Sequence, residues 1–181
     1  MVIDGKKIVL GVTGGIAAYK SCELVRLLIK NGADVNVIMT QSAQKFVTPL
    51  TFETLSRNRV ITGMFDDPHT YEIEHIALSD KCDLVIVAPA TANIIAKYAA
   101  GICDDFLSTF LISCDARKLF APAMNNKMWE HTFTQRNLKT IKDCGSIVIE
   151  PGTGELACDT TGKGRMAEAR EIYVKADEIL V

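Results

Sequence analysis

Five short apolar segments recur along the chain at intervals that leave room for a helix between them. They are KIVLGV (7–12), ADVNVIM (33–39), DLVIVAPA (83–90), KLFAPA (118–123) and SIVIEP (146–151). Several are apolar at nearly every position, which is typical of strands that are covered on both faces of a sheet. The alternation therefore predicts a single-domain α/β protein with a parallel, doubly wound sheet.

Helical patterns occupy the intervals and close the chain. In IAAYKSCELVRLLIKNG, one expected helix face carries Ile16, Leu24, Leu27 and Leu28, and Gly32 marks the end of the helix. Further helices are expected in TANIIAKYAA (91–100), in 104–113 and in AEAREIYVKADEIL (167–180). Ligands of such sheets bind at the carboxyl ends of the strands, so the residues that follow each strand are the candidates for function.

Length and charge exclude several classes of protein. A chain of 181 residues suits one domain, and its net charge of -2 argues against a nucleic-acid groove or an anionic-membrane surface. No apolar run approaches the roughly 20 residues that a membrane span needs. The first residues, MVIDGKKIVLGV, lack a signal-peptide pattern, and so we expect a cytoplasmic protein.

The six cysteines do not indicate a disulfide scaffold or a zinc site. None is arranged as CxxC, and five of them lie in or beside apolar segments: Cys22, Cys82, Cys103, Cys114 and Cys144. We expect these five to be small buried thiols. Cys158 differs, because the segment around it, GTGELACDTTGKGRM (152–166), consists largely of turn-forming residues.

A glycine turn follows the first expected strand, and hydroxyl side chains follow the second. Gly14 and Gly15 lie at a helix start, where converging backbone N–H groups can hold a phosphate. A plain glycine turn is the alternative, because the segment matches neither G-x-G-x-x-G nor the P-loop pattern. Thr40 and Ser42 are either helix caps or further donors to the same phosphate.

Polar residues also follow the next two expected strands. Thr91 and Asn93 either cap a helix or contact a flat ring that the small neighbouring residues admit, and Asp104 is expected to be an N-cap. In PAMNNKMW (122–129), the Asn125 amide offers both a donor and an acceptor to a carboxylate. By residue type alone, Met128 and Trp129 in the same segment are more commonly core residues.

His75 is one of three histidines in the chain. It has no second histidine or cysteine at metal-ligand spacing, so the sequence predicts no zinc site. A lone histidine of this kind either packs and caps or acts as an acid and base. Glu72 and Glu74, if they lie close in space, favour its protonated form.

Taken together, five segments resemble the flavin-dependent cysteine decarboxylases, and within that family the branch that acts in coenzyme A biosynthesis. The segments are TGGIAAYK (13–20), HIALSD (75–80), PATANIIAKYAAGICDDFL (89–107), PAMNNKMW (122–129) and LACDTTGKGRM (156–166). The resemblance spans nearly the whole chain and implies a Rossmann-like, flavodoxin-like flavoprotein fold. It is a resemblance to the stand-alone decarboxylase, without the ligase domain that is fused to it in many bacteria.

The resemblance implies FMN as cofactor and no metal. The FMN phosphate is expected near the glycine turn and the two hydroxyls after the second strand, and the ring against 89–93 and 121–124. The implied cofactor contacts are Gly14, Gly15, Ile16, Thr40, Ser42, Ala90, Thr91, Asn93, Ala121 and Met124.

The resemblance also implies roles for individual residues. His75 matches the family's catalytic acid and base, and Asn125 the residue that holds the substrate carboxylate. Cys158 matches the cysteine of a substrate flap at about 152–166, whose glycines allow closure. A thiol with an ordinary pKa of about 8.5 is mostly protonated at neutral pH and can act as an acid. Met128 and Arg165 are expected to contact the substrate, whereas Lys163 is expected to be a solvated charge.

The implied reaction converts 4'-phosphopantothenoylcysteine to 4'-phosphopantetheine and CO2 through a thioaldehyde and an ene-thiol. Losing CO2 from a saturated carbon requires an electron sink that no side chain supplies, and a cofactor must therefore provide it. The alternatives are a peptidyl-cysteine decarboxylase of lantibiotic maturation and a non-catalytic regulatory subunit. Cys158 favours the coenzyme A branch, because only that branch needs an acid for the final reduction.

Two further points follow from the resemblance. The family commonly has glycine after the flap cysteine, whereas this chain has Asp159. Relatives assemble as homotrimers, in some cases as a dodecamer, with FMN between subunits. We therefore expect a homo-oligomer with a small-molecule substrate and with neither a nucleic acid nor a membrane as partner.

Overall fold

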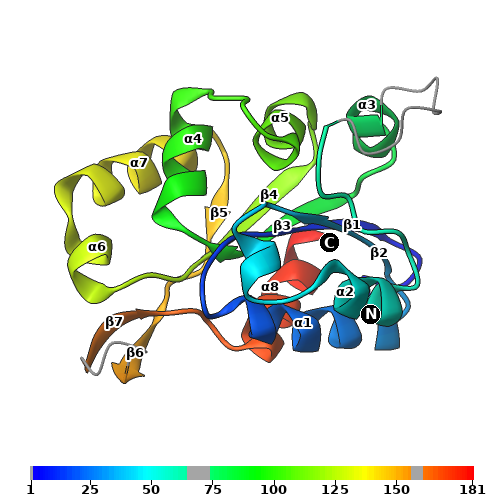
Figure 1. The fold of residues 1–181 in the computed structure, drawn as a ribbon, viewed down its shortest axis with the longest axis horizontal. Coiled ribbons are helices and arrows are strands. Elements are labelled where there is room, and N and C mark those ends of the chain that lie inside the picture. The colour runs from blue at the N-terminus through cyan, green and yellow to red at the C-terminus, as the bar shows by residue number, and fades with distance from the viewer. Residues whose placement is uncertain (1, 65–73, 156–160) are drawn as a thin grey trace.

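Five parallel strands form the central sheet of the residues that the computed structural model describes, which are 2–64, 74–155 and 161–181 (Figure 1). The order across the sheet is β2-β1-β3-β4-β5. The strands are β1 (Lys7–Val12), β2 (Asp34–Met39), β3 (Leu84–Ala90), β4 (Arg117–Pro122) and β5 (Ile147–Val148). A separate antiparallel hairpin pairs β6 (Gly152–Glu155) with β7 (Thr161–Arg165).

Helices cover both faces of the sheet. They are α1 (Ala18–Lys30), α2 (Pro49–Ser56), α3 (Glu74–Ser79), α4 (Ala92–Ala100), α5 (Phe106–Ser113), α6 (Asn126–Glu130), α7 (Thr132–Asp143) and α8 (Ala169–Ile179), with a 3-10 turn at Ala43–Lys45. In Figure 1, α1, α2 and α8 lie below the sheet, and α3, α4, α5 and α7 lie above it. No helix of the described ranges is long and apolar enough to cross a bilayer.

Alternate residues of each strand enter two separate cores. From β1, Leu10 packs in the core with Leu24 of α1, whereas Val9 packs in the opposite core with Phe110 of α5. All four side chains are at most 1% exposed. Burying a side chain of this size stabilises the fold by about 1.5–3 kcal/mol, and burial on both faces explains why the strands are apolar at successive positions.

The doubly wound parallel sheet predicted from the sequence is confirmed. Four predicted strands agree with the structure to within one residue at each end, but in the fifth segment only Ile147 and Val148 pair with β4. The expectation that Ile16 lies on the buried face of the first helix is wrong. The helix begins at Ala18, so Ile16 lies in the glycine turn, where it is 59% exposed.

The expectation of five buried thiols is only partly confirmed. Cys114 is buried, and Cys22 and Cys82 are half-buried, but Cys103 and Cys144 are exposed. Cys103 follows the end of α4, and Cys144 is the cap that ends α7, so the helices turn both thiols toward solvent. Cys158 lies outside the described residues.

The strand order places a crossover point between β1 and β3. From β1 the chain continues to β2 on one side, and it returns to β3 on the other side of β1. At such a reversal the loops leave in opposite directions and open a crevice at the carboxyl ends of the two strands. The segments that follow β1, β2 and β3 all meet there.

Candidate cofactor and substrate site

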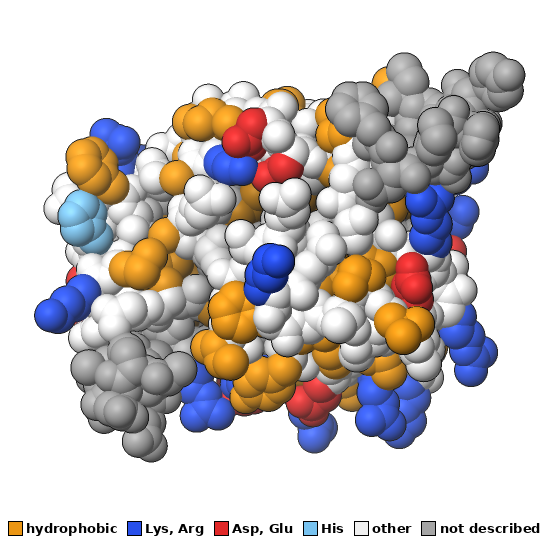
Figure 2. Space-filling model, in the orientation of Figure 1, with side chains coloured by type: hydrophobic (Ala, Val, Ile, Leu, Met, Phe, Trp, Pro, Cys, Tyr) orange, Lys and Arg blue, Asp and Glu red, His pale blue; other side chains and the backbone are white. Residues whose placement is uncertain are grey.

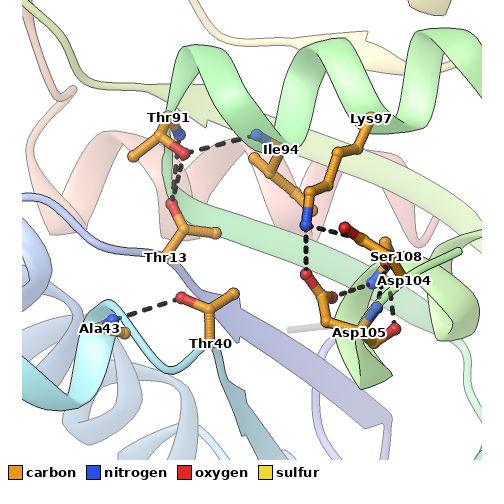
Figure 3. Close-up of polar contacts among 9 residues, drawn as sticks. All are labelled: Thr13, Thr40, Ala43, Thr91, Ile94, Lys97, Asp104, Asp105 and Ser108. Carbon is orange, nitrogen blue, oxygen red and sulfur yellow. Dashed lines mark hydrogen bonds and ion pairs between the residues drawn. The ribbon is translucent and has the colours of Figure 1, made fainter. Parts of the chain in front are cut away.

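Thr13, directly after β1, ties together the two loops that leave the crossover point. Its hydroxyl donates to the Pro89 carbonyl oxygen at 2.6 Å, and the Thr91 backbone N–H donates to Thr13 Oγ1 at 3.2 Å. Thr13 lies between Thr91 and Thr40 in Figure 3 and is only 2% exposed. We predicted no role for this residue. Its signal in the sequence was a hydroxyl at the first position after a buried strand.

Gly14 brings the loop after β1 into contact with the loop after β2. A Cβ atom at Gly14 would lie 2.3 Å from Ser42 Cβ and 3.0 Å from the Ser42 carbonyl carbon, so no larger residue fits this backbone. At Gly15 the nearest atom would be Thr91 Cγ2 at 3.8 Å, which is an ordinary contact. Gly14 thus completes a backbone cradle between the ends of β1 and β2, whereas a small side chain would fit at Gly15.

Hydroxyl and backbone donors surround a cavity of about 790 Å³ at this point, a size typical of small-molecule sites. Thr40 Oγ1 accepts from the Ala43 N–H at 3.3 Å, which leaves the hydroxyl hydrogen as a donor. The N-terminus of α4 also borders the cavity, and helix N-termini favour anions. The predicted contacts that line it are Gly14, Thr40, Ser42, Thr91 and Asn93.

Thr91 also acts as the helix cap that the sequence allowed. Its hydroxyl accepts from the Ile94 N–H at 3.5 Å and so caps α4. The capping role and a position in the cavity wall therefore coincide in one residue. A cap of this kind orients the first N–H groups of α4 toward the cavity.

One wall of the cavity carries a cluster of charges that we did not predict. Lys97 Nζ lies 2.6 Å from Asp104 Oδ1 and 2.7 Å from Asp105 Oδ2, with the lysine side chain 18% exposed (Figure 3). Burial opposes the charged form of Lys97, but the hydrogen bonds to the two carboxylates outweigh it and raise the lysine pKa. Its signal in the sequence was a lysine inside an otherwise apolar helix, followed by paired aspartates.

The expectation that Asp104 is an N-cap is wrong. Asp105 caps α5: its Oδ1 accepts from the Ser108 N–H at 2.8 Å, and Ser108 Oγ accepts from the Asp105 N–H at 3.1 Å. The helix starts one residue later than expected, so Asp104 turns to Lys97 instead. Because two carboxylates face one ammonium, this wall has a net negative charge. An anionic ligand group therefore belongs at the opposite end of the cavity, beside Gly14 and Ser42.

A second cavity of about 550 Å³ adjoins the first, and the two share Gly14, Thr91, Ala92 and Met128 in their walls. Asn125 lies in its wall and caps α6, with its Oδ1 accepting from the Lys127 N–H at 2.8 Å. That bond uses the amide oxygen, so the –NH2 group is the part that can donate to a carboxylate. The predicted contacts that line this cavity are Gly15, Ile16, Met124, Asn125, Met128 and Arg165.

The two residues expected to be core have different environments. Trp129 is 6% exposed and packs among the side chains between α7 and the sheet. Met128 is 49% exposed and borders both cavities, so the core expectation is wrong for this residue. The one-turn helix α6 separates them, because adjacent positions of a helix point to different sides.

Strand β7 is docked onto the loop that carries Asn125. The Met124 N–H donates to the Gly164 carbonyl oxygen at 3.0 Å, and a Cβ at Gly164 would lie 2.1 Å from the Met124 oxygen. A Cβ at Gly162 would lie 2.8 Å from Asn126 Cβ. The glycines of this segment thus permit close packing, a role that the expected flap closure did not include.

Lys163 strengthens this docking although its side chain is still 42% exposed, as expected of a partly solvated charge. Its ammonium lies 2.6 Å from Glu150 Oε2 and 5.6 Å from the centre of the Trp129 ring. The hydrogen bond from Lys163 lowers the pKa of Glu150 below its usual value, against the smaller opposing effect of burial. The environment of this lysine is determined by its contacts with Glu150 and Trp129, and not by the sequence of its own loop.

Several predicted residues lie outside both cavities or outside the described residues. Ala90 and Ala121 are fully buried at the ends of β3 and β4 and line neither cavity, so their cofactor contacts stay predictions. His75 lies in α3, but its side chain is outside the described part. Cys158 and Asp159 also fall outside it.

A crossover-point crevice with a glycine and hydroxyl cradle and an adjoining cavity defines a class of α/β proteins that bind a phosphate-bearing cofactor. The family model described as Flavoprotein matches residues 2–180. The chain therefore belongs to the Flavoprotein family.

Relatives of known name agree with this assignment. The chain is 46% identical over 177 residues to the coenzyme A biosynthesis bifunctional protein CoaBC of Bacillus subtilis (strain 168), covering 98% of this chain and 44% of the relative. It is 44% identical over 173 residues to the protein of the same name from Haemophilus influenzae, covering 96% and 43%. The chain thus spans less than half the length of these relatives.

Solved structures share the fold. A mutant PPC decarboxylase complexed with pantothenoylaminoethenethiol matches with a TM-score of 0.86 and 29% identity, covering 95% of this chain and 96% of that chain. The FMN binding protein AtHal3 matches with a TM-score of 0.82 and 30% identity, covering 94% of each chain. Both similarities extend over the whole arrangement of sheet and helices.

Proposed function

We propose that this chain is an FMN-dependent decarboxylase that converts 4'-phosphopantothenoyl-L-cysteine to 4'-phosphopantetheine and CO2 in coenzyme A biosynthesis. The names of the relatives and of the structural neighbour support this assignment. The observation that carries it is the position of Asn125: its amide lines a cavity that adjoins a glycine-closed cradle suited to a phosphate. We expect the reaction to take place in the cytoplasm.

The residues present fit FMN. The contact between Gly14 and Ser42 leaves no space for a side chain, as a backbone cradle for a phosphate requires. The two joined cavities of about 790 and 550 Å³ give separate space to a phosphate-bearing chain and to a ring with a substrate beside it. Gly14, Thr40 and Ser42 would hold the phosphate. When bound, FMN supplies a reversible two-electron oxidation of the substrate's cysteine unit.

The chain's own residues then position the substrate and move protons. Asn125 donates its –NH2 group to the substrate carboxylate while its oxygen remains bonded to the Lys127 N–H, so α6 fixes the direction of the amide. A neutral donor suits this task, because the carboxylate must leave as uncharged CO2. His75 acts as the acid and base near the substrate thiol, and Cys158 donates the proton of the final step.

The active form is a homo-oligomer, a trimer or a dodecamer built from trimers. Helix α3, which carries His75, lies at the opposite end of the molecule from α6, beside Asn125 (Figure 1). A site that uses both residues therefore needs a second copy of the chain. Ile16 and Tyr19 are apolar cavity residues that are about 60% exposed, and hydrophobic side chains gather over the same part of the molecule in Figure 2.

Complementation between two inactive variants tests this arrangement. His75→Asn and Asn125→Asp, each inactive alone, are co-expressed with different affinity tags, and the mixed oligomers are purified through both tags. In a trimer that contains both variants, about one of the three sites then receives both intact residues if each site takes its two residues from different copies. Mixed oligomers without activity contradict the shared site, and mass measurement in solution checks the trimer separately.

Product analysis of a cysteine variant tests the assigned proton donor. Cys158→Ser is expected to release CO2 from 4'-phosphopantothenoylcysteine at a measurable rate but to accumulate the ene-thiol or its oxidised form. Mass spectrometry distinguishes this product from 4'-phosphopantetheine by two hydrogen atoms. An ordinary yield of 4'-phosphopantetheine from the variant contradicts the role. A wild-type product that stops at the ene-thiol would favour a peptidyl-cysteine type of reaction instead.

A further inference from the structure

Two cations and one carboxylate form a cluster in the wall of the second cavity. Lys20 Nζ donates to Glu168 Oε1 at 2.9 Å, and an Arg165 guanidinium nitrogen donates to the same oxygen at 3.0 Å. Lys20 and Arg165 both line the cavity that Asn125 borders. With two positive charges and one negative charge, the cluster has a net charge of +1.

The fold holds this cluster in place independently of the phosphate cradle. Lys20 lies in the first turn of α1, Glu168 caps α8, and Arg165 ends β7. The Lys20 side chain is only 9% exposed, whereas Glu168 and Arg165 are about half exposed. A buried ammonium requires a partner, and the hydrogen bond from Lys20 lowers the pKa of Glu168 below its usual value. The carboxylate thus stays charged and holds both cations at the cavity wall.

The excess positive charge calls for an anion, and the proposed substrate has two. One is the cysteine carboxylate, which loses its charge as CO2 leaves. Cations on that group would stabilise the ground state more than the transition state and slow the reaction. The other is the phosphate at the far end of the substrate, which keeps its charge throughout. Cations on the phosphate bind the ground state and the transition state equally, as a specificity site should.

We propose that Lys20 and Arg165, held by Glu168, form the subsite for the phosphate dianion of the substrate. The neutral Asn125 amide therefore binds the carboxylate of the substrate, and the cationic cluster binds its phosphate. This inference rests on the proposed function for the identity of the substrate, and it assigns a task to two residues, Lys20 and Glu168, for which the sequence predicted none. Arginine and lysine are the side chains that bind phosphates in fixed geometry.

Binding measurements with two matched ligands test the subsite without turnover. The FMN-loaded protein is titrated by calorimetry with 4'-phosphopantetheine and with pantetheine, which lacks the phosphate. We expect wild type to prefer the phosphorylated ligand by about tenfold or more, as one or two charge-assisted hydrogen bonds provide. Arg165→Gln should lower this preference several-fold. Arg170→Gln, which removes the same charge from an exposed position of α8, should leave the preference unchanged.

Lys20→Gln provides a second variant of the same subsite, and circular dichroism shows whether it is folded. Equal affinity of wild type for the two ligands overturns the proposal, as does an equal effect of Arg165→Gln and Arg170→Gln. Failure of the subsite and failure of the proposed function give different results. A protein that prefers 4'-phosphopantetheine but releases no CO2 retains the subsite and loses the activity. A protein that decarboxylates but ignores the phosphate retains the activity and loses the subsite.

Discussion

The two adjoining cavities are built in different ways. The first lies at the ends of β1, β2 and β3, and its wall includes Gly14, the hydroxyl side chains of Thr13, Thr40 and Thr91 and the N-terminus of α4, which all follow strands of the sheet. The second depends on Asn125, Arg165 and Met128, which come from a one-turn helix and a hairpin strand outside the central sheet. On the proposed function, the cofactor would bind at loops that the central sheet holds in place. The substrate would bind beside elements whose position depends on side-chain contacts.

The largest expected effect lies in the second cavity. Asn125→Asp keeps an oxygen that accepts from the Lys127 N–H, so the cap of α6 and the melting temperature should be nearly unchanged. The variant loses the –NH2 donor and adds a charge that repels the substrate carboxylate. Turnover is therefore expected to fall by about 100-fold or more, as for the loss of a catalytic donor.

Steady-state rates and thermal unfolding of the same preparation separate these two effects. A large drop in melting temperature together with the loss of turnover would reduce Asn125 to a structural cap. Turnover close to that of wild type would remove it from the substrate site.

Gly14→Ala tests the first cavity. Its Cβ would lie 2.3 Å from Ser42 Cβ, so the cradle must open, and affinity for FMN is expected to fall by about 10- to 100-fold from overpacking alone. Gly15→Ala is the matched comparison, because its nearest contact would be 3.8 Å, and its loss should be much smaller. Fluorescence titration of apoprotein with FMN measures both, and equal losses would contradict the account of the cradle.

Gly162→Ala tests whether close packing fixes the second cavity. The new Cβ would lie 2.8 Å from Asn126 Cβ, and such overpacking costs about 1–3 kcal/mol of unfolding free energy. Gly154 pairs with Gly162 across the hairpin, and its Cβ would meet only the Arg165 side chain, with Nη1 at 3.7 Å and Cδ at 3.9 Å. Gly154→Ala is therefore the control. Denaturant unfolding that gives the same stability for both variants would show that β7 is not docked tightly on α6.

The smallest effect concerns the ion pair between Lys163 and Glu150. As a largely exposed pair it contributes about 0–1 kcal/mol. Because the folded state lowers the pKa of Glu150, its contribution is present at neutral pH and is lost as pH falls through that lowered value. The stability difference between wild type and Glu150→Gln should therefore shrink below about pH 4. A difference that grows on acidification would contradict the direction of this pKa.

The sequence predicted the sheet and the first cavity better than the second. Continuous apolar strands indicate burial on both faces, and their ends then locate Gly14, Thr40 and Thr91 without further information. Short helices such as α6 carry little periodic signal, so the exposure of Met128 was indicated by the family resemblance and not by the local pattern. The start of α5 at Phe106 depends on which of two adjacent aspartates caps the helix, and their patterns are equivalent.

Residues that act through long-range pairs escaped prediction for a related reason. Lys20 and Glu168 are separated by 148 positions, and nothing in either segment indicates that they meet. Lys163 lies in a loop sequence that does not indicate its partners, yet β7 places it beside Glu150 and Trp129. Contacts of this kind follow from the packing of α8 and β7 against earlier elements, which a local pattern does not contain.

The mass of the product tests the central claim most directly. Purified, FMN-loaded protein is incubated with 4'-phosphopantothenoyl-L-cysteine, and the product is identified by mass spectrometry. We predict 4'-phosphopantetheine, which is lighter than the substrate by one CO2 and shows no net change in oxidation state. Unchanged substrate, from protein that has demonstrably bound FMN, would contradict the account.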